Sequence, residues 1–153
     1  MNHDCAVDRA ALQTLLTTVV APWVTDLNLR VLAATPGEVT LALPIAPRHV
    51  HGGGVLCGQT LMAAADTAMI LAIVSQTGAF QPMTTVQLQT SFLRPIPGKP
   101  AGNPAADVDG SPAEARVIAR VLRLGKTLLF GEIKVQDPAG RLAAHATATY
   151  ALL

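Results

Sequence analysis

The stretch His51–Thr77, HGGGVLCGQTLMAAADTAMILAIVSQT, decides the fold of this chain. A glycine-rich turn runs into a long apolar segment, which predicts a helix from about Leu56 to Thr77 that Gly78 ends. This helix carries a single charge, Asp66, well past any plausible capping position. Its neighbours on the same helix face cannot pair with a carboxylate; they are Met62, Ala63, Met69 and Ile70. A buried carboxylate shifts its pKa or finds donors elsewhere in the fold, so Asp66 is either a catalytic group or a core hydrogen-bonding residue.

Composition bounds the class of protein. The 153 residues are 50% hydrophobic with a net charge of +1, which predicts one domain over residues 1–153 with a substantial core and no nucleic-acid partner. Cys5 and Cys57 fit a reducing compartment better than a disulfide framework. The first residues lack the basic region of a signal peptide, so we expect a cytoplasmic protein.

The apolar run has a rival interpretation as a membrane span. Val55 to Val74 has about the ~20 residues that a span needs. Five polar or flexible residues interrupt it: Gly58, Gln59, Thr60, Asp66 and Thr67. A charge at the centre of a span is costly, so we expect no membrane partner and a core helix covered by a sheet.

The remaining pattern predicts the other elements. Residues 1–22 hold an N-terminal helix, Asp8–Val20, which Asp8 can cap and Pro22 ends. In the strand from Thr84, the period of two places Val86 and Leu88 on one face. Residues 99–112 read as a loop insertion. The other expected strands are Leu27–Ala34, Glu38–Leu43, Ala115–Leu124, Thr127–Gln136 and Leu142–Leu152. This order indicates an α+β fold, an antiparallel sheet wrapped around a long central helix.

Four short motifs, in this order and spacing, resemble those of a known family. They are ADTA at 65–68, SFLRP at 91–95, LGK at 124–126 and TATY at 147–150. From Leu27 to its C-terminus, the chain resembles the hotdog-fold acyl-CoA thioesterases of the phenylacetic-acid-degradation (PaaI) type. The resemblance implies hydrolysis of an acyl-CoA to a free acid and coenzyme A.

The glycine loop matches the family pattern with two departures. That pattern is Asn, two residues, Gly, two residues, then His-Gly-Gly, with the acid nine positions after the His. Anchoring on Asp66 places His51 at the Asn, Gly54 at the Gly, Cys57 at the His and Gly58 at the Gly that follows. Matching His51-Gly52-Gly53 to the His-Gly-Gly instead leaves the acid fifteen positions away, so we reject that alignment.

The resemblance implies three catalytic residues. Asp66 would be the general base or the nucleophile, and the Gly58 N–H would polarise the thioester oxygen with help from the helix dipole. Thr85 matches the Ser or Thr that holds the attacking water. It would reach the acid from the partner subunit, so the resemblance implies a homodimer, paired into a tetramer. Thr85 has the alternative of a solvent-facing strand residue.

Five further residues are candidate substrate contacts: His51, Cys57, Gln59, Arg94 and Lys126. Each has a structural alternative: loop fixing for His51, a small buried group for Cys57, a core amide for Gln59, and solvated turn residues for the two cations. A nucleophilic Cys57 is a weaker interpretation, because the spacing dictates no paired His. We expect His49 to be an exposed loop residue. No metal-ligand cluster appears, and no cofactor is expected beyond the coenzyme A of the substrate.

Two rival functions stay open. An enoyl-thioester hydratase or dehydratase of the same fold would pair a catalytic His with an acid, and here only His51 could serve. A non-catalytic acyl-CoA-binding or regulatory hotdog protein is compatible with the departure at Cys57.

Overall fold

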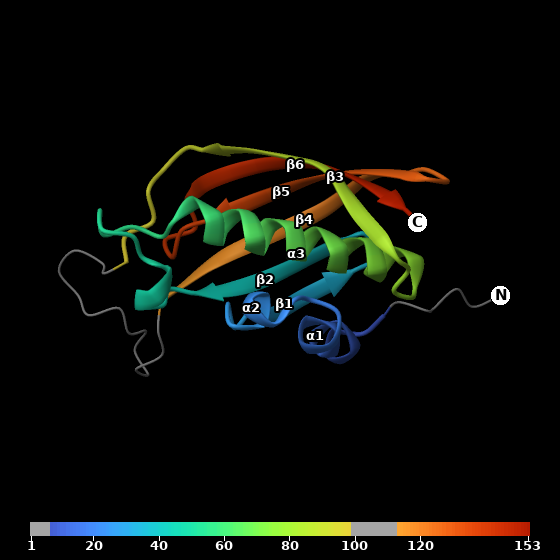
Figure 1. The fold of residues 1–153 in the computed structure, drawn as a ribbon, viewed down its shortest axis with the longest axis horizontal. Coiled ribbons are helices and arrows are strands. Elements are labelled where there is room, and N and C mark those ends of the chain that lie inside the picture. Colours follow the sequence, from blue (N-terminus) through green and yellow to red (C-terminus); the bar gives the residue numbers. More distant parts are fainter. Residues whose placement is uncertain (1–6, 99–112) are drawn as a thin grey trace.

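The computed structural model describes residues 7–98 and 113–153 as one six-stranded antiparallel sheet packed against a long helix. The strands lie in the order β1-β2-β4-β5-β6-β3, and helix α3 runs diagonally across one face of the sheet (Figure 1). The predicted α+β architecture is confirmed. The predicted insertion at 99–112 and Cys5 lie outside the described residues.

The two long helices and the six strands agree with the predicted elements to within a few residues, whereas the short helices α2 and η1 were not predicted. Their bounds are α1 Arg9–Thr18, α2 Pro22–Thr25, β1 Arg30–Thr35, β2 Glu38–Pro44, η1 Pro47–His49, α3 Gly58–Thr77, β3 Met83–Phe92, β4 Glu114–Leu124, β5 Leu128–Gln136 and β6 Leu142–Leu152. Asp8 caps α1, where its carboxylate accepts the Ala11 N–H at 2.7 Å. Pro22 begins the short helix α2.

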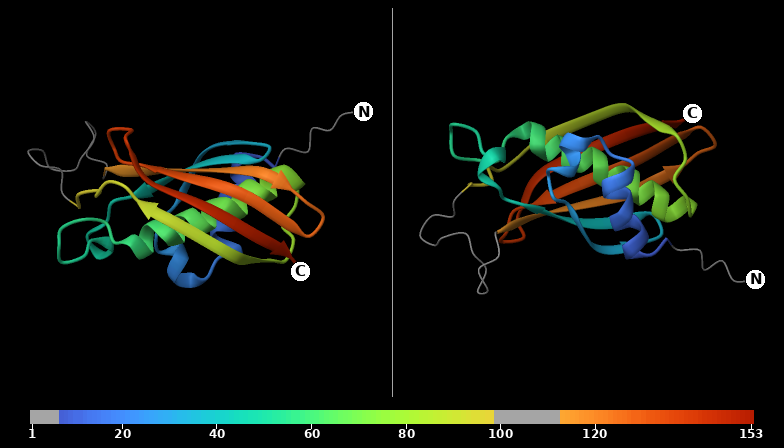
Figure 2. Two further views of the ribbon diagram at one scale, coloured as in Figure 1. Left: turned by 90° about the horizontal axis from the view of Figure 1, so that it is seen from above. Right: turned by 60° about the horizontal axis from the view of Figure 1, so that its bottom comes forward.

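Helix α3 is the centre of the core. It contacts all six strands, and the two turned views show it lying along one face of the curved sheet (Figure 2). It starts at Gly58, two residues later than predicted, because Leu56 still pairs as a β-bridge with Val50. Gly78 ends it with φ +84°, a left-handed conformation that glycine adopts without steric cost.

Helix α3 also has the length and mean hydropathy of a membrane span. In the structure, 67% of its most apolar window is buried inside the fold. The apolar run is therefore accounted for by the core helix of this sheet.

Strand β3 departs from the predicted alternation. A bulge between Thr85 and Gln87 leaves Val86 59% exposed, while Leu88 packs against the buried core. The prediction that Val86 and Leu88 share a face is wrong, because the extra residue of a bulge shifts the side-chain alternation by one position. As a result, both Thr85 and Leu88 lie on the helix side of the sheet.

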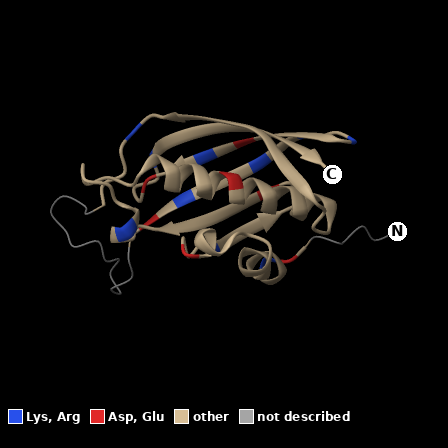
Figure 3. Ribbon diagram, in the orientation of Figure 1, with Lys and Arg blue, Asp and Glu red and all other residues tan. Residues whose placement is uncertain are grey.

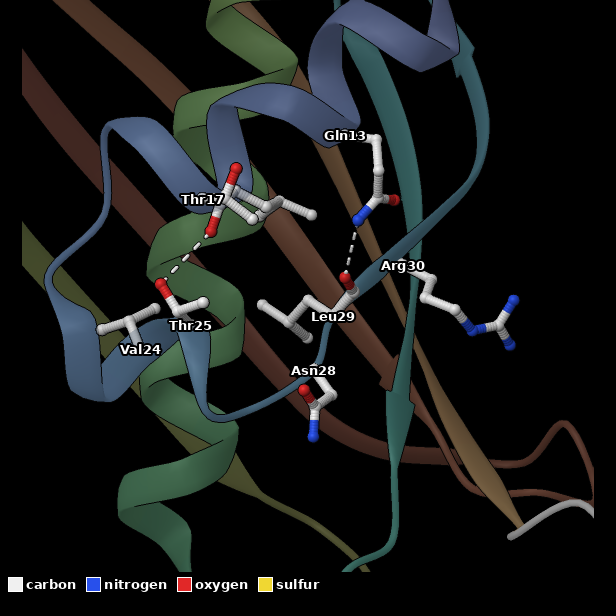
Figure 4. Close-up of a pocket in the computed structure, with 8 residues that line it drawn as sticks. Gln13, Thr17, Val24, Thr25, Asn28, Leu29 and Arg30 are labelled. Carbon is white, nitrogen blue, oxygen red and sulfur yellow. Dashed lines mark hydrogen bonds between the residues drawn. The ribbon is translucent and has the colours of Figure 1, made fainter.

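The two edges of the sheet differ. At β1, the Gln13 side chain of α1 donates to the Leu29 carbonyl at 3.2 Å (Figure 4). The same side chain accepts the Val31 N–H at 2.8 Å. These two bonds occupy backbone groups on the outer side of β1. The residues in Figure 4 line a cavity between α1, α2 and β1. Its volume is about 280 Å³, and none of the predicted site residues lines it. At the other edge, no described element pairs with the free side of β3.

Candidate active site at the central helix

Asp66 lies in the middle of α3 as its single charged residue, visible as the red band on that helix (Figure 3). Its side chain is half-buried. Two hydroxyl groups from the sheet donate to it: Thr85 Oγ1 lies 2.9 Å from Asp66 Oδ1, and the Tyr150 hydroxyl bonds the same oxygen. Of the two routes open to a buried carboxylate, the structure therefore shows hydrogen-bond donors from elsewhere in the fold.

Thr85 contacts Asp66 within one chain. The prediction that it reaches the acid from the partner subunit is wrong, because β3 passes beside α3 and points this side chain inward. The alternative of a solvent-facing Thr is wrong for the same reason.

Tyr150 is a site residue that sequence reasoning missed. It is 1% exposed, and its hydroxyl lies 2.9 Å from the Asp66 carbonyl oxygen as well as bonding the carboxylate. Burial, and then the negative charge of Asp66, raise the pKa of this phenol well above its usual range, so it remains a protonated donor. The alternation of β6 carried a signal, since Tyr150 follows the inward-facing Ala146 and Ala148 at a spacing of two.

A second group of predicted residues lies at the N-terminus of α3. Gly58, His51 and Arg94 line one cavity of about 390 Å³ together with Phe92 and Leu61. The Gly58 N–H is one of the first helical donors, and it has no acceptor among the described residues. This cavity therefore offers an apolar wall, one cation and a backbone N–H at the positive end of the helix dipole.

Close packing explains why residue 58 is a glycine. A Cβ built on Gly58 would lie 3.0 Å from the Phe92 ring, closer than such contacts normally are. A side chain here would therefore require the Phe92 ring to shift by a few tenths of an ångström. Phe92 itself is 51% exposed at the end of β3.

The acid and the glycine N–H do not meet within one chain. Asp66 follows Gly58 by eight residues on α3, which corresponds to about 12 Å along the helix axis. A thioester carbonyl bound at Gly58 is thus about two helical turns from the carboxylate of the same chain.

The structure separates the remaining candidates. His51 is exposed, and its Nδ1 accepts the Gly53 N–H at 2.9 Å, so it fixes its own loop. Gln59 is exposed, which excludes the core-amide alternative. Cys57 is half-buried as the residue before α3, with its Sγ 3.0 Å from Thr60 Oγ1.

Arg94 and Lys126 lie at opposite ends of the sheet. The Arg94 N–H bonds the Ala143 carbonyl at the start of β6, whereas Lys126 adjoins Thr127, whose carbonyl bonds Leu152 at the end of β6. A strand of this length spans about 30 Å, so one chain does not bring the two cations to one ligand.

His49 is half-buried, and the prediction of an exposed loop residue is wrong. It ends η1, and its carbonyl accepts the Cys57 N–H at 2.9 Å, tying η1 to the start of α3. Desolvation, followed by the nearby Arg48 charge, lowers the pKa of the imidazole. The described residues bring no three His, Cys, Asp or Glu side chains together as a metal site.

Comparisons with known proteins agree with this architecture. No protein-family model matches the chain. Two archaeal proteins, each provisionally named an esterase, are similar in sequence. One, from Thermoplasma volcanium, is 28% identical over 76% of this chain and 76% of its own. The other, from Saccharolobus solfataricus, is 28% identical over 83% of this chain and 80% of its own.

Solved structures of the same fold cover most of the chain. The zebra fish thioesterase superfamily member 2 matches with a TM-score of 0.77 at 20% identity, covering 96% of this chain and 99% of that one. A variant of the phenylacetic acid degradation protein PaaI from Thermus thermophilus matches with a TM-score of 0.69 at 25% identity, covering 87% and 100%. The chain therefore has the hotdog fold, and its resemblance to the PaaI-like thioesterases of that fold is confirmed.

Proposed function

We propose that this protein is a hydrolase that cleaves an acyl-CoA thioester to a carboxylic acid and coenzyme A. The thioesterase and esterase names among the similar proteins support hydrolysis in general. The observation that carries the proposal is Asp66, a half-buried carboxylate that accepts two hydroxyl hydrogen bonds on an otherwise uncharged helix.

Asp66 supplies the acid-base chemistry. As a general base, its carboxylate takes a proton from water while the water oxygen bonds to the acyl carbon. The C–S bond then breaks, and the coenzyme A thiolate leaves with the proton that Asp66 received. As a nucleophile, Asp66 would instead form an acyl-enzyme anhydride that water hydrolyses to the same products. Both routes need an ionised carboxylate.

The cavity at Gly58 binds the substrate and stabilises the charge that develops on the thioester oxygen. The Gly58 N–H, backed by the dipole of α3, donates to the thioester oxygen as negative charge develops on it. The apolar lining, with Phe92 and Leu61, accommodates the uncharged part of the substrate next to the thioester. Arg94 at the same cavity is the cation available for a coenzyme A phosphate.

A homodimer completes the site in this proposal. Because Gly58 and Asp66 are about 12 Å apart along one helix, a carbonyl held at one Gly58 would meet the acid of a second copy. The free edge of β3 supports this assembly, since it carries Thr85 next to Asp66 and has no described partner, whereas the β1 edge is occupied by Gln13. Pairing of dimers into a tetramer, and a cytoplasmic location, belong to the same proposal.

The rival functions use this site differently. A hydratase would need an imidazole beside the acid, and His51 lies fifteen residues before Asp66 in an exposed loop. Cys57 favours a non-catalytic acyl-CoA binder, because it stands just before α3 at the position where the family pattern has a His.

The experiment is coenzyme A release from aromatic and aliphatic acyl-CoAs, run beside calorimetric titration of the same compounds. We expect turnover of at least one acyl class, and the ranking names that class. Binding without release from any thioester would contradict the proposal and favour the binder. Addition of water to an enoyl-CoA with the thioester intact would favour the hydratase.

A further inference from the structure

We infer that Tyr150 is a positioning residue for the reaction: with Thr85 it binds Oδ1 of Asp66 and leaves Oδ2 as the oxygen that acts on water or on the thioester. This inference rests on the proposed function for its catalytic meaning. It also stands on a geometry that can be tested without turnover.

Both hydroxyl groups donate a hydrogen bond to the same carboxylate oxygen of Asp66. Thr85 Oγ1 lies 2.9 Å from Asp66 Oδ1, and the Tyr150 hydroxyl bonds that same atom. Asp66 Oδ2 receives no hydrogen bond from the described residues. A carboxylate oxygen that accepts two hydroxyl protons is less basic than its partner, so Oδ2 keeps the lone pairs available for chemistry.

The backbone makes this arrangement rigid. Thr85 on β3 and Tyr150 on β6 are direct partners in the sheet register, with their side chains on the face that α3 covers. Thr85 lies immediately before the bulge, so its side chain points toward α3. Pairing of β3 with β6 continues from Gln87 after the bulge. Tyr150 also lies 2.9 Å from the Asp66 carbonyl, so one phenol contacts the backbone and the side chain of the same residue.

A purely structural role of Tyr150 in the core can be distinguished from a role of its hydroxyl group. Tyr150 is 1% exposed and packs in the core, so its ring contributes to stability whatever its hydroxyl does. Tyr150→Phe keeps the ring and removes only the donor. Loss of a hydrogen bond to the charged form raises the pKa of a carboxyl group, whereas loss of packing does not.

The first test is the pH profile of kcat for wild type and Tyr150→Phe. We expect the acid limb of the variant to move to higher pH, and kcat at neutral pH to fall roughly 10- to 100-fold with KM unchanged. Thr85→Val removes the other donor to the same oxygen and is expected to move the acid limb in the same direction. The matched control is Thr147→Val, an exposed hydroxyl on β6, which is expected to leave the profile unchanged.

The second test does not depend on activity. Carbon-13 NMR of labelled aspartate follows the titration of the Asp66 carboxyl, assigned by its absence in Asp66→Asn. We expect a higher carboxyl pKa in Tyr150→Phe than in wild type. A protein that hydrolyses no thioester but shows this shift would contradict the proposed function and uphold the Tyr150–Asp66 contact.

Fluorotyrosine gives a variant that keeps the hydroxyl. The chain contains one tyrosine, so biosynthetic labelling changes Tyr150 alone. Fluorine makes the phenol a stronger donor, and we expect the carboxyl pKa of Asp66 to fall, in the direction opposite to Tyr150→Phe. If Tyr150→Phe does not fold, the Asp66 titration is measured in the fluorotyrosine-labelled protein instead. An unchanged Asp66 titration in whichever of these two proteins folds would overturn the inference.

Discussion

The side chains that hold Asp66 come from two strands that lie far apart in the sequence, β3 and β6. Thr85 and Tyr150 donate hydrogen bonds to its carboxylate from the sheet, whereas the Gly58 N–H lies about two helical turns away at the start of the same helix. At the scale of single residues, the site therefore depends on the hydroxyl hydrogen bonds of Thr85 and Tyr150 and on the lack of a side chain at Gly58.

Gly58→Ala tests the missing side chain. The added Cβ would lie 3.0 Å from the Phe92 ring, so this ring, which lines the same cavity as Gly58, must shift by a few tenths of an ångström. We expect kcat/KM for acyl-CoA hydrolysis to fall by less than the roughly 10²-fold typical of losing one oxyanion donor, because alanine keeps the backbone N–H. The control is Gly52→Ala in the loop before α3, where a Cβ meets nothing within 4 Å and activity should persist.

Tyr150 also predicts how stability depends on pH. Its folded-state pKa is raised above the unfolded value of about 10, so its contribution is complete below that pH and is lost as pH rises further. We expect the free energy of unfolding to fall by up to about 1.4 kcal/mol per pH unit above pH 10. Urea unfolding measures this slope, and subtracting the Tyr150→Phe curve removes the contribution of lysines. Equal slopes in the two proteins would contradict the assignment.

At the scale of elements, the turn between β5 and β6 shows how a buried carboxylate serves structure alone. Asp137 is 3% exposed and accepts the N–H groups of Ala139 and Arg141 at 3.0 and 2.9 Å, and the Arg141 Nε–H at 2.8 Å. Burial alone would raise the pKa of this carboxyl, but these hydrogen bonds and the Arg141 charge outweigh it and lower the pKa.

Asp137→Asn should weaken that turn. We expect it to lower the free energy of unfolding by about 1–3 kcal/mol at pH 7, the cost of losing a charged partner at a buried site. Because a lowered pKa stabilises the fold fully above the unfolded value and loses that contribution as pH falls through the lower folded value, the difference from wild type should narrow as pH falls below about 4. Chemical denaturation at pH 7 and pH 3 measures both. Asp26→Asn, at an exposed position, serves as the control.

The elements themselves could be predicted from the sequence, because each is encoded by local pattern. Alternation gave the strands, and the apolar run with Gly78 gave α3. The bulge at Val86 could not be predicted, since an extra residue in one strand is set by the pairing with β6 rather than by its own sequence. The hydrogen-bond donors to Asp66 could not be predicted for a related reason. Tyr150 lies 84 positions further along the chain, and only the pairing of the strands places it beside Asp66.

At the scale of the whole molecule, the fold places the acid and the helix N-terminus too far apart to serve one thioester. The predicted crossing of subunits by Thr85 was wrong, yet the described chain still leaves Gly58 and Asp66 about 12 Å apart. We therefore expect that Gly58 of one copy and Asp66 of another form each site.

Mixing two inactive variants tests this arrangement. In a heterodimer of Gly58→Leu and Asp66→Asn chains, one site would combine the intact glycine of one chain with the intact acid of the other. After joint refolding with random pairing, we expect about a quarter of wild-type turnover. Each variant refolded alone is the control. A mixture that stays inactive although heterodimers form, as measured by native mass spectrometry, would place the whole site in one chain.

The central claim is that Asp66 performs the hydrolysis of a thioester, and one measurement tests it most directly. Coenzyme A release from the preferred acyl-CoA is compared for wild type and Asp66→Asn, with equal binding of substrate verified for both. The account predicts turnover by wild type and a loss of roughly 10²- to 10⁴-fold in kcat for the variant, since the amide neither accepts the proton nor attacks the carbonyl. Undiminished turnover by a folded Asp66→Asn protein would contradict it.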